Sequence, residues 1–295
     1  MPMEASMFKV LSIGYLVRRM LHEAGSFEMH SQFRHALNLK SVDGGLLSLL
    51  GAEAGDFPTA IRLMVPTGWD WRDVRFDRPV VYDQGTLFGD GWSADLKDPT
   101  HWQPEVTRAK DAVDLPLPAY HTALAEALRT YVDQHGVISA LRLLPDEQLH
   151  ARAPSLMLEA DRQSVDAGVR ALVGYGSGLT PDGDDYLLGY IAALWPWRDT
   201  PGVDGHLDLI RQSIRRLLPG TTDISRHYLA LALDGHFSGS VSRLISALVS
   251  GQPVADVVLL AHAVMRFGAA SGVDTLAGVL HGTRTLQAAV TQCSV

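Results

Sequence analysis

Glycines, hydroxyl residues and aspartates gather in one segment of this chain, Gly174–Gly189, in a pattern that suits the binding of a small polar ligand. A glycine-rich stretch leads into Thr180-Pro181, and Asp184 and Asp185 then open an apolar run. Glycines permit positive φ angles and let backbone N–H groups approach a ligand closely. The threonine and proline indicate a helix start, with the hydroxyl as N-cap and the proline at the first helical position. Exposed N–H groups at such a start favour anions.

The two aspartates of this segment have two interpretations. Carboxylates in the first turn of a helix complement its dipole, which requires no further function. They also suit a divalent cation, or hydrogen bonds from a substrate that carries an amide. The whole string is more specific than a glycine-rich loop, so we predict a functional site here with Asp184 and Asp185 as catalytic residues. The sequence does not identify a cofactor; Mg²⁺ is the ion that these two carboxylates would hold.

A second copy of the motif lies near the end of the chain. The pattern Gly-x-Asp-x-Leu-x-Gly spans residues 183–189 and recurs at residues 272–278. Its aspartate and final glycine are four residues apart, so they share one face of a helix. We therefore predict that two helix starts face each other and that Asp185 and Asp274, the third predicted catalytic residue, line one pocket. The alternative is that the glycines only allow two helices to cross tightly.

Thr221, Thr222 and Asp223 form a third helix start that is rich in hydroxyl groups. A capping role alone would explain them. The functional alternative is that they add hydrogen-bond donors to the same ligand.

Other familiar motifs are excluded. No Lys-Ser/Thr pair follows the glycines as a phosphate-binding loop requires, and Leu179 stands where a dinucleotide fingerprint needs its third glycine. Ser177 does not fit the Gly-x-Ser-x-Gly pattern of a nucleophile elbow. None of the 12 histidines falls in a metal-ligand pattern. His227 and His236 are closest to the third helix start, where an imidazole can serve as acid or base, although a lone histidine is more often simply packed.

The elements that must position these residues form two parts. Short strand patterns separated by glycine, proline and aspartate predict a β-rich domain at residues 1–115, including strands at 60–65, 74–77, 79–82 and 86–88. Prolines among charges at Asp98–Pro118 predict a linker. Helical periodicity then predicts a bundle of about seven helices at residues 116–295. The predicted fold class is α+β, with a β-rich N-terminal part followed by an all-helical C-terminal bundle.

Bulk properties limit the partners. A net charge of −8 argues against nucleic acid and anionic membrane surfaces as partners, while a small anionic substrate remains compatible with it. The single cysteine, Cys293, cannot support a disulfide framework or a cysteine zinc cluster. The apolar stretch Met7–Val17 contains Lys9 and lacks the features of a secretory signal. We expect a cytoplasmic protein.

The string Gly178–Asp185, with Thr221–Asp223 and Ser271–Asp274 downstream, resembles a bacterial family long catalogued as a domain of unknown function. That family includes a subunit of oxamate carbamoyltransferase, from anaerobic allantoin (ureide) breakdown in purine metabolism, and some members carry the label carboxylase. The resemblance extends from about Gly174 to Gly282 and is looser in the N-terminal half, where His30–Phe33 is similar. The family pattern carries over to the following residues: Gly178, Thr180, Gly183, Asp184, Asp185, Thr222 and Asp274.

The resemblance implies a carbamoyltransferase subunit that works with two other subunits on carbamoyl phosphate and oxamate. Several aspartates beside a phosphate would repel it unless a cation or a basic side chain intervenes, and Arg226 is the candidate. The predicted substrate-binding residues are Gly176, Ser177, Gly178, Thr180, Gly183, Thr221, Thr222, Arg226, Ser271 and Gly272. Two alternatives stay open: a metal-dependent hydrolase, with the aspartates as oxygen ligands, and a non-catalytic subunit that binds a ligand and holds its partners together.

Overall fold

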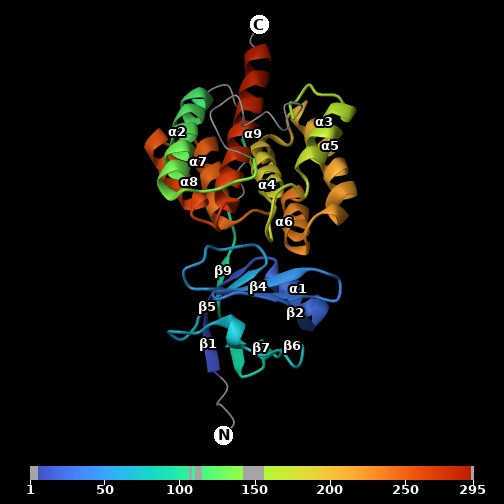
Figure 1. Cartoon of the computed structure of the whole chain (residues 1–295), viewed down its shortest axis with the longest axis vertical. Coiled ribbons are helices and arrows are strands. Elements are labelled where there is room, and N and C mark those ends of the chain that lie inside the picture. The colour runs from blue at the N-terminus through green and yellow to red at the C-terminus, as the bar shows by residue number, and fades with distance from the viewer. Residues whose placement is uncertain (1–5, 106–107, 110–114, 142–155, 294–295) are drawn as a thin grey trace. The chain divides into compact units, whose positions relative to one another are not determined.

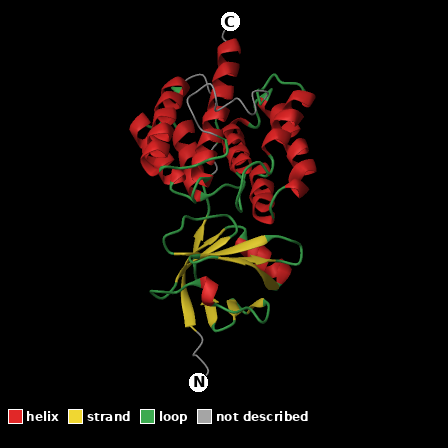
Figure 2. Cartoon of the chain, in the orientation of Figure 1, coloured by secondary structure: helices red, strands yellow, loops and turns green. Residues whose placement is uncertain are grey.

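The computed structural model describes residues 6–105, 108–109, 115–141 and 156–293 of the 295-residue chain (Figure 1). Its backbone contacts divide the chain into two compact units, Met1–Pro104 and Glu105–Val295. The first unit consists mainly of strands, and helices build the second (Figure 2). The predicted domain boundary between residues 115 and 116 stays a prediction, because residues 110–114 beside it lie outside the described residues.

The first unit is a closed barrel. Eight strands are hydrogen-bonded in the order β5-β4-β3-β2-β6-β7-β8-β1, and β1 also pairs with β5, which closes the ring. Strand β9 (Thr100–Trp102) joins β1 in parallel, inside the segment expected to be a linker. The barrel strands are β1 (Ser6–Gly14), β2 (Ser26–Gln32), β3 (Ala36–Lys40), β4 (Leu46–Gly51), β5 (Ala60–Met64), β6 (Val80–Asp83), β7 (Thr86–Gly89) and β8 (Trp92–Asp95).

The predicted fold class needs correction in this unit. The N-terminal part is not simply β-rich, because its first strand pairs with its fifth and the sheet closes into a barrel. Residues Ser6–Phe8 of β1 pair with β8, and residues Lys9–Ile13 pair with β5. The pairing with β5 shifts register between Val10 and Ser12, and β1 is thus hydrogen-bonded to both strands. Helix α1 (Val17–Ala24) was not expected either. The predicted strand at 74–77 is a loop, in which the Asp77 N–H binds the Asp90 carboxylate instead of a neighbouring strand.

The barrel interior is apolar and aromatic. Phe8 stacks on Trp92 with ring centroids 6.0 Å apart. Trp71 contacts the Trp92 indole edge-to-face, with ring centroids 5.3 Å apart. Alternate residues of β3 and β4, such as Leu37 and Leu47, are fully buried, as expected for strands with one face inside a barrel.

The described part of the second unit contains eight α-helices, one more than the seven expected. None of them has both the length and the apolar character that crossing a membrane requires. Helix α2 ends at Gly136, which has the left-handed conformation typical of helix C-termini. The helices are α2 (Leu117–His135), α3 (Arg162–Leu172), α4 (Asp182–Leu194), α5 (Val203–Leu217), α6 (Asp223–Leu233), α7 (Gly239–Val249), α8 (Val254–Met265) and α9 (Ser271–Cys293).

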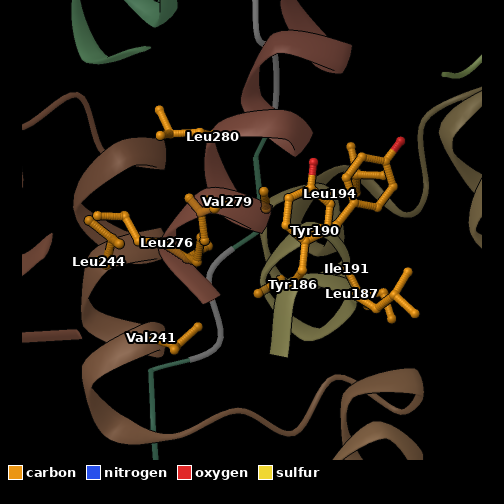
Figure 3. Packing of buried hydrophobic residues seen from close by; sticks show 14 of the residues in the cluster. Tyr186, Leu187, Tyr190, Ile191, Leu194, Val241, Leu244, Leu276, Val279 and Leu280 are labelled. Carbon is orange, nitrogen blue, oxygen red and sulfur yellow. The ribbon is translucent and has the colours of Figure 1, made fainter. Parts of the chain in front are cut away.

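Helices α4 and α9 carry the two motif copies and pack against each other more extensively than any other pair of elements. A Cβ atom on Gly189 would lie 1.9 Å from the Thr275 carbonyl oxygen, and one on Gly278 would lie 1.9 Å from that of Tyr186. Tyr186 and Thr275 occupy the same position in the two copies, so the crossing is nearly symmetric. Buried side chains of α4, α7 and α9 gather in one cluster around it (Figure 3).

We expect Gly189→Ala to destabilise the helical unit by about 3 kcal/mol, because backbone atoms leave the added methyl group no room. For a unit of this size the melting temperature should fall by roughly 6–12 °C, measured by calorimetry. Gly205→Ala in α5 is the matched control, since a Cβ there would meet no atom within 4 Å. It should change stability by about 1 kcal/mol or less. Equal effects of the two substitutions would contradict the tight crossing.

Candidate functional site

The starts of α4 and α9 lie side by side, and the two motif aspartates face the same region. The Oγ1 atom of Thr180, just before α4, lies 2.8 Å from the Oγ atom of Ser271, the first residue of α9. Both hydroxyl groups hydrogen-bond to the Asp185 carboxyl group. Asp274 accepts a hydrogen bond of 2.6 Å from the Ser139 hydroxyl. The structure therefore brings together Asp185 and Asp274, which the sequence placed 89 residues apart.

Burial shifts the protonation of both acids. Desolvation raises the pKa of Asp185 to about 8, against the effect of its hydroxyl partners. Desolvation also raises the pKa of Asp274 to about 8, and the nearby Asp182 and Asp185 carboxylates raise it further. The Oδ2 atom of each residue is buried and has no hydrogen-bond partner among the described residues. A buried polar atom without a partner is costly, so a bound ligand is one way to satisfy it.

Two residues of this site were missed by the sequence analysis, Asp182 and Ser139. The Ser139 hydroxyl donates to Asp274 and lies 3.4 Å from Asp182 Oδ2, which also accepts a short bond from the Ala140 N–H. The Tyr175 hydroxyl donates to the Ala140 carbonyl at 3.3 Å, which is a second contact between the glycine-rich loop and the backbone next to Ser139. Asp182 was recognisable as a third acid in the Asp-Gly-Asp-Asp string. Nothing in the sequence near Ser139 signals its role, because that residue follows α2 in a different part of the chain.

Asp184 has a different environment from Asp185. Its Oδ1 accepts from the Gly174 N–H at 2.9 Å, and its Oδ2 accepts from the Thr221 hydroxyl. Burial raises the pKa of Asp184, while the hydrogen bonds from Thr221 and Gly174 lower it. The carboxyl group thus ties the glycine-rich loop and the start of α6 to α4. Its predicted catalytic and metal-binding roles stay predictions.

The glycine-rich loop passes close to both helix starts. A Cβ on Gly174, with φ of 70°, would lie 2.6 Å from the Gly220 carbonyl oxygen before α6. A Cβ on Gly176, with φ of 118°, would lie 2.7 Å from the Asp182 nitrogen. Only glycine accommodates such positive angles and contacts together. Ser177 and Gly178 are exposed at the tip of this loop.

The backbone N–H groups expected to face an anion are largely used within the fold. Helix α4 begins at Asp182 with Pro181 as its N-cap, so Thr180 is not the cap that the sequence suggested. The Gly183 N–H binds the Tyr175 carbonyl at 2.8 Å, and those of Asp184 and Asp185 bind Pro181. At α9, the N–H groups of Gly272, Val273 and Asp274 likewise bind the preceding turn. Side chains, rather than these N–H groups, are therefore the polar groups left for a ligand.

The third helix start meets the first through Thr221 and Thr222. Thr222 is the N-cap of α6, where its hydroxyl accepts from the Ser225 N–H at 3.1 Å and donates to the Leu179 carbonyl at 2.5 Å. Capping and contact with the glycine-rich loop therefore occur together. Arg226 donates to the carbonyls of Leu218 and Thr221 and pairs with Asp223 at 3.1 Å. Its predicted role beside the substrate stays a prediction.

For a metal, the described residues contain no group of three or more His, Cys, Asp or Glu side chains placed to hold an ion.

Two buried tyrosine–histidine pairs, whose tyrosines lie on α4, were also missed by the sequence analysis. The hydroxyl of Tyr186 lies 2.8 Å from His281 Nδ1, and that of Tyr190 lies 2.8 Å from His206 Nε2. Burial lowers the pKa of His206 to about 4, so this imidazole is neutral in the folded protein.

The fold and the site define a two-unit protein, in which a strand barrel precedes a helical unit with paired, buried acids. Residues 172–283 match a family model described as oxamate carbamoyltransferase subunit AllH, and residues 9–101 match one described as the AllH family N-terminal domain. The chain belongs to the AllH family. No solved structure matches it.

We expect the free energy of unfolding to fall as pH rises from about 6.5 towards 8. Between their ordinary pKa of 3.8 and the folded value of about 8, Asp185 and Asp274 hold protons in the folded state that they lose on unfolding. Each acid can contribute a slope of up to about 1.4 kcal/mol per pH unit. Urea unfolding at several pH values measures this slope.

The double variant Asp185→Asn/Asp274→Asn provides the comparison, because an amide does not titrate. Its unfolding free energy should fall less steeply over the same window. Both proteins keep His206, which takes up a proton on unfolding near its ordinary pKa of 6.5, so its contribution is the same in both and cancels in the difference between the slopes. Identical slopes for the two proteins would show that these acids are ionised in the folded chain.

Proposed function

We propose that this chain supplies the substrate-binding site of a carbamoyltransferase, at the adjacent starts of α4, α6 and α9. The reaction joins carbamoyl phosphate and oxamate to give oxalurate and phosphate, and two other subunits complete the enzyme. The description of the matching family, oxamate carbamoyltransferase subunit, supports this assignment. The observation that carries it is the pair of buried acids, Asp185 and Asp274, each with one carboxyl oxygen that lacks a partner among the described residues.

The chemistry of this transfer matches what the site offers. The amide nitrogen of oxamate attacks the carbamoyl carbon, the bond from that carbon to the phosphate oxygen breaks, and the nitrogen loses a proton. Both reactants carry an NH₂ group that needs an acceptor and anionic oxygens that need donors. The carboxyl groups of Asp185 and Asp274 and the hydroxyls of Thr180 and Ser271 provide both kinds of group. A water-poor site also strengthens each of these hydrogen bonds.

The test is phosphate release from carbamoyl phosphate plus oxamate, assayed with the chain and its partner subunits together. Asp185→Ala and Asp274→Ala should each lower kcat/KM by at least roughly 100-fold, because each removes a group proposed to contact the substrate. Asp256→Ala is the matched control, as this exposed aspartate also lies in the first turn of a helix. It should leave the rate within about twofold.

Three results would contradict this function. No phosphate release by the assembled, folded subunits would exclude the reaction. Full activity after Asp185→Ala would indicate instead a subunit that only holds its partners together. A divalent ion that remains bound through purification and is required for water-dependent hydrolysis would favour the metal-dependent alternative.

A further inference from the structure

Four carboxyl groups share the interior of this site without a basic partner. Asp182, Asp184, Asp185 and Asp274 are exposed by 7%, 2%, 9% and 0% respectively. None of the ion pairs between described residues involves any of the four. Several adjacent buried carboxylates without counter-charges would be strongly unfavourable, so protons must neutralise some of them.

The hydrogen bonds indicate which oxygens carry those protons. Both oxygens of Asp184 accept from protein donors, and Asp182 Oδ2 accepts from the Ala140 N–H. An oxygen that accepts a bond in this way is poorly placed to hold a proton. The Oδ2 atoms of Asp185 and Asp274 receive no such bond from the described residues. They are the available positions, and a protonated Oδ2 is a donor that lacks only an acceptor.

We infer that Asp185 and Asp274 bind the substrate as neutral carboxylic acids, each donating its Oδ2–H to an oxygen of a small carboxylate- or phosphate-bearing anion. This inference rests on the proposed function and adds the protonation state of the site. Hydrogen bonds from a neutral acid to an ionised oxygen are charge-assisted and strong. The expected repulsion between these two aspartates and an anionic substrate is then absent, and Arg226 is not needed to offset it.

The surroundings of the two acids are acidic or neutral. The charged groups that act on Asp185 are Asp184 and Asp182, and those that act on Asp274 are Asp182 and Asp185. Hydroxyl groups from Thr180, Ser271 and Ser139 complete the contacts. Arginines on the packed elements are paired elsewhere or exposed. Arg170 of α3 pairs with Asp166, Arg211 of α5 with Asp208 and Arg226 of α6 with Asp223, while Arg129 of α2, Arg243 of α7, Arg266 after α8 and Arg284 of α9 are exposed. His281 and His206 bond to Tyr186 and Tyr190, and burial lowers the pKa of His227 of α6 to about 4. With such neighbours, both acids lose their protons only in alkaline solution.

Oxamate binding to the full chain, measured by titration calorimetry between about pH 6.5 and 9.5, tests the inference. Oxamate is a suitable probe because its carboxylate stays ionised throughout this range. For each acid that must be neutral, the affinity of the wild-type chain should fall on the order of 30-fold by pH 9.5, given a pKa of about 8. The same titration with the assembled subunits shows whether partners change the profile.

Asparagine is the informative substitution, since its NH₂ group donates where the neutral acid does. Asp185→Asn/Asp274→Asn should bind oxamate at pH 6.5 within roughly threefold of the wild type and keep that affinity at pH 9.5. Asp185→Ala should lose most binding at both pH values. Asp256→Asn should reproduce the wild-type profile, as its side chain is exposed.

Three outcomes would overturn the inference: an affinity that is constant or rises with pH, asparagine variants that lose binding as completely as Asp185→Ala, or no oxamate binding at pH 6.5 by chain or complex. The wild-type profile needs no variant, so a variant that fails to fold does not remove the test. The proposed function is judged separately. If carbamoyl transfer occurs but oxamate affinity does not change with pH, the proposed reaction stands and the neutral acids are rejected. If the affinity falls with pH as expected but no transfer occurs, the neutral acids stand and the proposed reaction is rejected.

Discussion

The close crossing of α4 and α9 is the constraint on which the rest of the helical unit depends. Gly189 and Gly278 bring each helix against a carbonyl oxygen of the other, at a distance that no side chain could share. Because each glycine follows its motif aspartate by four residues, the contact also fixes where the two acids lie. A spacing that serves packing thereby also sets where the two acids lie. The tight-crossing interpretation is confirmed, and the functional one stays a prediction.

Burial is the second consequence of this crossing. It removes Asp185 and Asp274 from water, which raises their pKa values, while hydroxyl groups rather than cations satisfy part of each carboxyl group. In the proposed function, two neutral acids can therefore face an anionic substrate without a cation between them. Asp184 differs from these two acids, because both of its carboxyl oxygens accept hydrogen bonds, one from Gly174 and one from Thr221. Its carboxyl group thereby links the loop before α4 to the start of α6. Adjacent residues of one motif therefore have separate environments.

The barrel illustrates what local patterns leave open. Alternation of apolar residues predicts strands such as Ala60–Met64, and turn residues predict where they end. Closure depends on β1 pairing with β5, between residues that lie some fifty positions apart and carry no complementary signal. The loop at residues 74–77 failed as a strand because its backbone found a side-chain partner. The matches to both AllH family models are consistent with an arrangement in which barrel and helical unit belong to one chain.

The sequence by itself determined the helical and strand-rich parts and the three segments that carry the predicted site residues, Gly174–Gly189, Thr221–Asp223 and Ser271–Asp274. Those features follow from periodicity, capping residues and glycine placement, which act within a few residues. Only the tertiary structure decided that the helix-start N–H groups are used internally, that Thr180 bonds to Ser271 instead of capping α4, and that Ser139 belongs to the site. Hydrogen-bond partners distant in the chain, and the depth of burial that sets protonation, are properties of packing. No local pattern encodes them.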